Sequence, residues 1–228
     1  MLPSSFLSSI VLAIHYLTDM SGPRRHPEAR VRAAAPSELG DVARVLTRAF
    51  VNDPAMNWYG CVNELVQDLD HPTPSEQKTI RNLHWFQTAL TRATFLVGGF
   101  IDVVVIPSGD GGGKEEIVAV GIWLPPGETL DLPPMTFLRA GLLKVILGWG
   151  FTGAKASSTC LSASPALTSW LYQRMILDFT PAVERALKTA FKSRGLDRLD
   201  SWYLFEMVVD PNHQGKGQYG STINGRSH

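Results

Sequence analysis

A glycine-rich, basic loop near the carboxyl end of the chain carries the residues best suited to chemistry. It follows an apolar stretch and reads, in order, Asp210, Pro211, Asn212, His213, Gln214, Gly215, Lys216 and Gly217. Glycines let backbone N–H groups turn inward and approach an anion closely, and a helix that followed would add the partial positive charge of its N-terminus. Lys216 adds a full charge nearby. The pattern predicts a cradle for a phosphate group.

Periodicity and start signals predict the helices that surround this loop. Apolar residues at helical spacing predict a first helix that opens at Pro36 and ends at residues 52–54. Thr73 and Glu76 can cap each other's amides around Pro74, and this capping box predicts a second helix running to about residue 94. Further helices are expected over residues 136–147, from Ser164, and from Thr180 to Gly195.

Strands are predicted where β-branched and aromatic residues gather between turn signals. These segments are residues 29–34, 100–106, 116–124 and 202–209. A glycine-rich turn over residues 108–114 should join the middle two strands into an antiparallel hairpin. The last strand leads directly into the basic loop, so the loop is expected to lie at one end of the predicted sheet.

Residues 209–217 resemble the acetyl-CoA motif of the GNAT N-acetyltransferase superfamily. In that motif a strand ending V-x-P is followed by Q/R-x-x-G-x-G/A and a helix, and Gln214 and Gly217 match its Gln and first Gly. The order of elements agrees over roughly residues 29–220, and residues 122–127 resemble a fungal-type subset. The resemblance implies an α/β (α+β) fold with a mixed, mainly antiparallel sheet flanked by helices. In it, residues 202–209 lie beside the second hairpin strand.

The resemblance also implies an activity: transfer of an acetyl group from acetyl-CoA to an amine by direct attack. The pantetheine arm would pair with the end of the motif strand, and the pyrophosphate would sit on the loop amides. The implied cofactor-binding residues are Met207, Val208, Val209, Gln214, Gly215, Lys216 and Gly217. A backbone N–H of the strand would polarise the thioester carbonyl. The acceptor is expected to be a small-molecule or peptide amine of unknown identity.

Glu206 is the candidate catalytic base, because a carboxylate in an apolar strand has a raised pKa. The alternative is a side chain on a solvent-facing stretch. A base takes the proton of the attacking amine, and an acid protonates the leaving thiolate.

Two features depart from the family pattern. Tyr219 stands where the motif has Gly or Ala, and the chain ends at His228. The family expects a further helix and strands, roughly 40 residues or more. We therefore expect a chain truncated or mis-spliced near Gln218, lacking the C-terminal strands and the usual Tyr acid. The alternative functions are a non-catalytic fragment with weak or no acetyl-CoA binding, and a nucleotide-binding protein.

Composition and charge narrow the function classes. The 228 residues carry 21 Lys plus Arg and 21 Asp plus Glu, and this zero net charge argues against a nucleic-acid binder. A hydrophobic fraction of 44% excludes wholesale disorder. Cys61 and Cys160 have no C-x-x-C spacing, and with His71 and His84 they form no metal pattern, so no metal site is expected.

The amino terminus leaves several readings open. Residues 1–28 are expected to be an extension, disordered or non-native, residues 29–220 an incomplete GNAT-like domain, and residues 221–228 a polar tail. The apolar run over residues 6–17 is shorter than the ~20 residues that span a bilayer, and no basic residue precedes Arg24. A signal or anchor, a packed extra helix, and a true start at Met20 all stay open. A cytoplasmic protein without a membrane partner is expected, of unknown oligomeric state.

Overall fold

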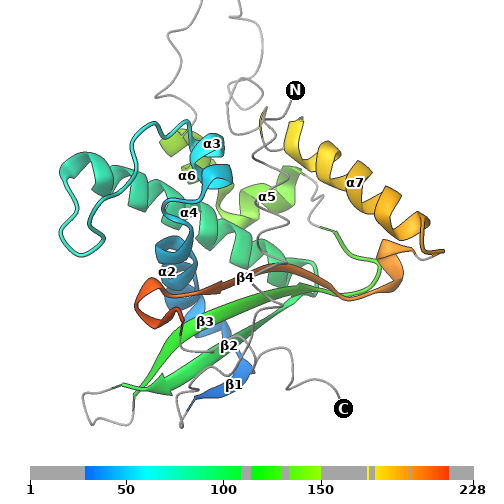
Figure 1. Cartoon of the computed structure of the whole chain (residues 1–228), viewed down its shortest axis with the longest axis horizontal. Helices are drawn as coiled ribbons and strands as arrows, with labels where there is room; N and C mark the ends of the chain where they lie inside the picture. Colours follow the sequence, from blue (N-terminus) through cyan, green and yellow to red (C-terminus); the bar gives the residue numbers. More distant parts are fainter. Residues whose placement is uncertain are drawn as a thin grey trace, which may run out of the picture.

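A computed structural model describes residues 29–108, 114–129, 134–149, 174, 178–195 and 197–215 (Figure 1). Several sequence predictions lie outside these residues. They concern the N-terminal extension, most of the hairpin turn, the helix from Ser164, Lys216, Gly217 and the tail.

The strands of the described residues form one antiparallel sheet in the order β1-β2-β3-β4. The strands are β1 (Arg30–Ala33), β2 (Phe100–Pro107), β3 (Glu115–Leu124) and β4 (Tyr203–Val209). The β2–β3 hairpin and the position of β4 beside β3 are as predicted. With helices packed on this antiparallel sheet, the predicted fold class is confirmed.

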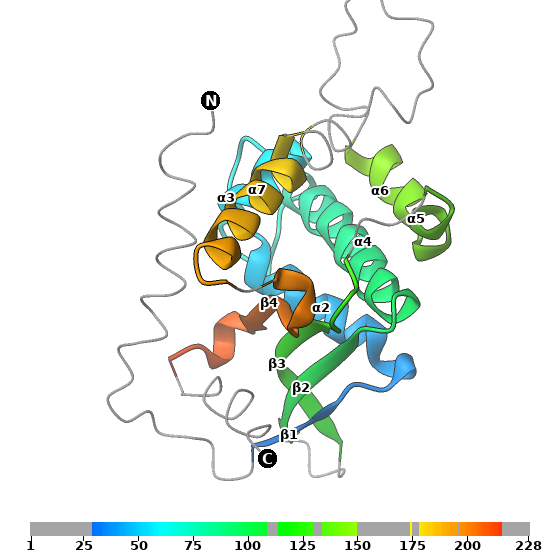
Figure 2. The same ribbon diagram turned by 90° about the vertical axis from the view of Figure 1, so that its right-hand side faces the viewer.

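Helices α2 to α7 lie on one side of the sheet in both Figure 1 and Figure 2. The helices are α2 (Leu39–Phe50), α3 (Pro54–Gly60), α4 (Pro74–Leu96), α5 (Pro134–Ala140), α6 (Leu142–Trp149) and α7 (Thr180–Lys192). Short 3-10 turns are η1 (Pro36–Glu38), η3 (Arg198–Asp200) and η4 (Pro211–His213). No helix within the described ranges is both long enough and apolar enough to cross a bilayer.

Three helix boundaries show how local signals act. The capping box before α4 is present: the Glu76 N–H donates to Thr73 Oγ1 at 3.3 Å, and the Thr73 N–H donates to Glu76 Oε2 at 2.7 Å. The single helix predicted over residues 136–147 was wrong, because Gly141 has φ +97° and separates α5 from α6. Helix α3 was not predicted. Asp53 caps it by accepting the N–H groups of two residues of its first turn.

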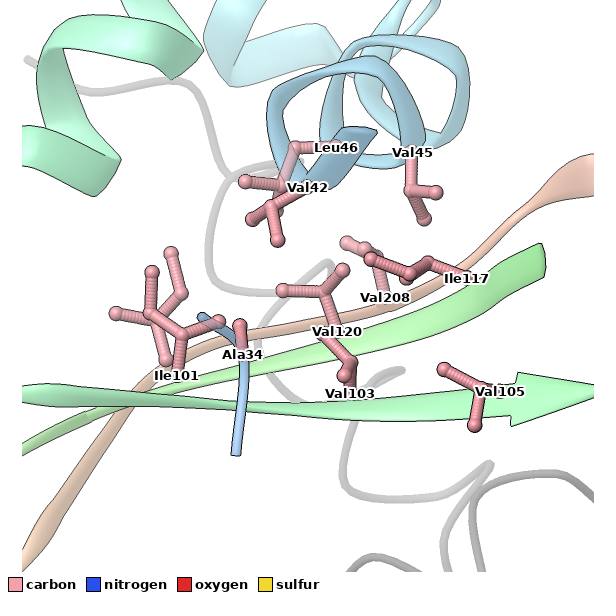
Figure 3. Packing of buried hydrophobic residues seen from close by; sticks show 11 residues of the cluster. Ala34, Val42, Val45, Leu46, Ile101, Val103, Val105, Ile117, Val120 and Val208 are labelled. Atoms are coloured by element: carbon pink, nitrogen blue, oxygen red, sulfur yellow. The ribbon is translucent and has the colours of Figure 1, made fainter. Parts of the chain in front are cut away.

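The main core lies between α2 and the sheet (Figure 3). Val42, Val45 and Leu46 form the apolar stripe of α2 and are fully buried. They pack against side chains of the strands. In β2 these partners are every second residue, since alternate residues of a strand face the same side. In β3 a bulge at Val118 places Ile117 and Val120, three residues apart, on the same side. The sheet contributes Ile101, Val103, Val105, Ile117, Val120, Ile122 and Val208. Val208 thereby ties β4 to α2, the two elements that meet at the candidate site.

A second buried cluster joins α3, α4 and α6. Its members are Val51, Met56, Tyr59, Val66, Leu83, Phe86, Ala89, Val145 and Trp149. The rings of Phe86 and Trp149 lie 5.2 Å apart. Gly60, at the end of α3, approaches the same Trp149 ring closely, and this contact fixes α3 on the helical layer.

Substituting Gly60 with alanine is expected to destabilise the protein by about 1–3 kcal/mol. The added Cβ would lie 2.9 Å from Cε2 of Trp149, whose side chain is only 3% exposed. Gly40→Ala is the matched control: nothing lies within 4 Å of its added Cβ, and it should stabilise α2 by up to about 1 kcal/mol. Urea unfolding measures both. A Gly60→Ala midpoint equal to that of the wild type would contradict this packing.

Candidate functional site

The chain leaves β4 through a tight, fully bonded turn at Asp210. The Asp210 N–H donates to the carbonyl of Val118 at 2.9 Å, and its own carbonyl accepts the N–H of His213 at 2.8 Å. Its Oδ1 accepts the N–H of Asn212 at 3.0 Å. Gly215 follows with φ +72°, a conformation that favours glycine. Asp210 and Pro211 therefore form a sharp exit from β4.

A hollow of about 400 Å³ lies beside this turn, between the end of α2 and β4. It is lined by Ala49, Phe50, Asn52, Asp53, Met207, Val208, Val209 and Gln214. Four of the residues predicted to bind the cofactor thus gather around one space, and Gly215 follows the last of them. Lys216 and Gly217 lie outside the described residues. Binding of acetyl-CoA by this set stays a prediction.

The outer edge of β4 pairs with no other strand of the described residues. Asp210 bonds to Val118 across the ladder, and two residues earlier Val208 lies opposite Val120. Because an antiparallel ladder alternates, the N–H and C=O groups of Met207 and Val209 point away from β3. The Gln214 side chain donates from Nε2 to the Val209 carbonyl at 3.1 Å, in agreement with this direction. Met207 and the Val209 N–H present an edge that an extended ligand can pair with.

A bulge interrupts β4 just before this edge. The register passes from Ile122 opposite Glu206 to Trp123 opposite Leu204, so Phe205 is an extra residue in β4. A bulge leaves local backbone groups out of the ladder and redirects neighbouring side chains. No residue type in the sequence signals it, and it was not predicted.

Glu206 shares the helix-facing side of β4 with Val208, two residues further on. Its Oε2 is buried and has no hydrogen-bond partner among the described residues. Burial, and then the negative charge of Asp53, raise the pKa of Glu206 to about 8. The raised pKa expected from the sequence is present, and the carboxyl group is not in a solvent-facing stretch. Its role as a base stays a prediction.

No family model and no curated protein matches the chain. Among solved structures it resembles a crystal structure described as histone acetyltransferase HPA2 and related acetyltransferase from Corynebacterium glutamicum. The two share 17% sequence identity with a TM-score of 0.43, and the match covers 87% of this chain and 69% of that one. Values this low assign neither a family nor an activity, so function rests on the residues of the site.

Sequence reasoning missed Asp53, which lines the hollow, and Tyr59, which interacts electrostatically with Glu206 and Asp53. Burial, followed by the negative charges of Glu206 and Asp53, raises the pKa of the Tyr59 hydroxyl, which therefore stays protonated. The Tyr59 ring is held edge-on against Phe179 at 5.3 Å. Asp53 could have been found, because Asp followed by Pro is a signal for a helix start. Within the described residues, no group of three or more His, Cys, Asp or Glu side chains is placed to hold a metal ion.

Proposed function

We propose that this chain is an acetyl-CoA-dependent N-acetyltransferase of the GNAT type. The observation that carries the proposal is the hollow beside the outward edge of β4, where Met207, Val209 and Gln214 meet. A pantetheine arm is an extended chain with two amides, and such a chain adds to a sheet edge through main-chain hydrogen bonds. The tight turn at Gly215 then leads into the predicted phosphate cradle.

Strand β4, which lines the hollow through Met207, Val208 and Val209, carries residues that suit acetyl transfer to an amine. Acetyl-CoA supplies the activated acetyl group. The nitrogen lone pair of the neutral acceptor amine forms the new C–N bond as the C–S bond breaks, and ionised Glu206 accepts the N–H proton that this nitrogen loses to give the amide. A general acid then protonates the leaving thiolate. An outward N–H of Met207 or Val209 donates to the thioester oxygen, where negative charge develops.

Calorimetric titration with acetyl-CoA tests the proposal. Gly217→Asp should weaken binding by roughly tenfold or more, because it adds bulk and a negative charge where the pyrophosphate must approach. Gly40→Asp is the control: it adds the same side chain at the exposed start of α2 and should leave the affinity unchanged. Equal affinities for the wild type and Gly217→Asp would contradict the motif assignment. A wild-type chain that binds no acetyl-CoA would favour the alternative, a non-catalytic domain.

A further inference from the structure

The last turn of α2 holds the exit of β4 through a partly buried ion pair. Arg48 Nε donates to Asp210 Oδ2 at 2.9 Å, and the two side chains are 19% and 4% exposed. The residues after Arg48 in the same turn of α2, Ala49 and Phe50, line the hollow. The last turn of α2 therefore lines the hollow with Ala49 and Phe50 and also binds the loop beside it through Arg48.

Each polar group of Asp210 has a hydrogen-bond partner among the described residues. Its Oδ2 is held by Arg48, its Oδ1 by the Asn212 N–H, and its backbone N–H and C=O by β3 and η4. A carboxylate this buried needs a paired cation, because water cannot replace the lost contact. The direction in which the chain leaves β4 is thus fixed from α2, across a sequence separation of 162 residues.

The other charged side chains near this ion pair lie at longer distances from Arg48 and Asp210 and are more exposed to solvent. Arg44 Nη1 lies 3.9 Å from Asp210 Oδ2, and the Arg44 side chain is 41% exposed. Asp70 lies 3.5 Å from Arg48 Nη1 but is 68% exposed. Exposed, longer pairs contribute little to stability. Arg48 is therefore the cation that decides the geometry at Asp210.

We propose that Arg48 is a positioning residue: by holding Asp210 it sets the turn that carries Gln214 to the hollow. The effect on the cofactor rests on the proposed function, whereas the effect on the turn does not. Arg48 touches neither the hollow nor the reacting atoms. It acts through Asp210, and its loss should loosen the turn while the sheet stays intact.

Hydrogen exchange on the free protein tests the effect on the turn. In Arg48→Met, the Asn212 and His213 amides should exchange roughly ten- to hundredfold faster than in the wild type, because a hydrogen bond between charged groups is lost. Central amides of β2 serve as the reference and should stay slow. Arg44→Met is the matched control and should leave the turn unchanged. Unchanged exchange at Asn212 and His213 in Arg48→Met would overturn the proposal.

Acetyl-CoA affinity separates positioning from a merely structural role. Arg48→Met combined with Asp210→Asn removes the unpaired buried charge and should fold like the wild type, yet its Kd should stay raised by roughly 10- to 100-fold. Arg48→Lys should bind acetyl-CoA more tightly than Arg48→Met but less tightly than the wild type. The control Arg44→Met should have the affinity of the wild type. A double variant with wild-type affinity would show that Arg48 is only structural. If the wild type itself binds no acetyl-CoA, the proposed function fails, and the exchange result still decides the role of Arg48.

Discussion

Glu206→Gln is expected to lower kcat for acetyl transfer by roughly 10²- to 10⁴-fold. Glutamine keeps the shape of the side chain but cannot accept the proton of the attacking amine. The affinity for acetyl-CoA should change little, because the proposed contacts to it are backbone groups of β4 and the loop. Release of the free thiol, followed with a panel of primary amines and peptides, measures the rate.

The pH profile makes this prediction specific to Glu206. In the wild type, kcat/KM should rise with pH and level off above about 8, because only the ionised carboxylate takes a proton and burial raises its pKa to about 8. This rise of kcat/KM with pH should be absent in Glu206→Gln. Glu128→Gln, the same substitution at an exposed site after β3, should change neither rate nor profile. A Glu206→Gln variant with wild-type activity would exclude the residue as the base.

Elements with complete local signals were predictable from the sequence. The capping box at Thr73 and the hairpin each depend on residues close together along the chain, and the structure has both. Failures arose where one signal serves two elements. Asp53 and Pro54 follow the end of α2 and also start α3. The sequence interpretation used them only as the signal that ends the first helix, and α3 was therefore missed. Gly141 stood inside an apolar period that otherwise favoured a continuous helix.

In the candidate site, too, the features set by local signals were predictable and those set by packing between distant segments were not. The turn at Asp210 and Gly215 was predictable, because Asp, Pro and Gly act on their own backbone. The approach of Asp53 and Tyr59 to Glu206, and of Arg48 to Asp210, depends on how α2 and α3 pack on the sheet. Such contacts join residues far apart in the chain, so no local pattern reports them. The pKa of Glu206 depends on both kinds of information: an apolar strand around it, and a distant aspartate beside it.

Ionisation of Glu206 should make the folded protein less stable as the pH rises. Its pKa is about 8 in the fold, against an ordinary value of 4.5 that applies to the unfolded chain. Below 4.5 both states hold the proton, and the stability is fully present. Between these values the unfolded chain has released the proton while the folded protein retains it, so the free energy of unfolding falls. Each pKa unit corresponds to about 1.4 kcal/mol, so the whole loss is on the order of 3–5 kcal/mol.

Glu206→Gln removes this loss, so the variant should match the wild type near pH 4 and be more stable by several kcal/mol near pH 9. Urea unfolding of both proteins across this pH range measures the difference, and the ionisation of other groups cancels in the comparison. One substitution is thus expected to raise stability and remove activity, a combination that misfolding cannot produce. If instead the two proteins lose stability in parallel as the pH rises, Glu206 ionises at its ordinary pKa. It would then be a permanently charged side chain, without the buried, proton-holding state on which its role as a base depends.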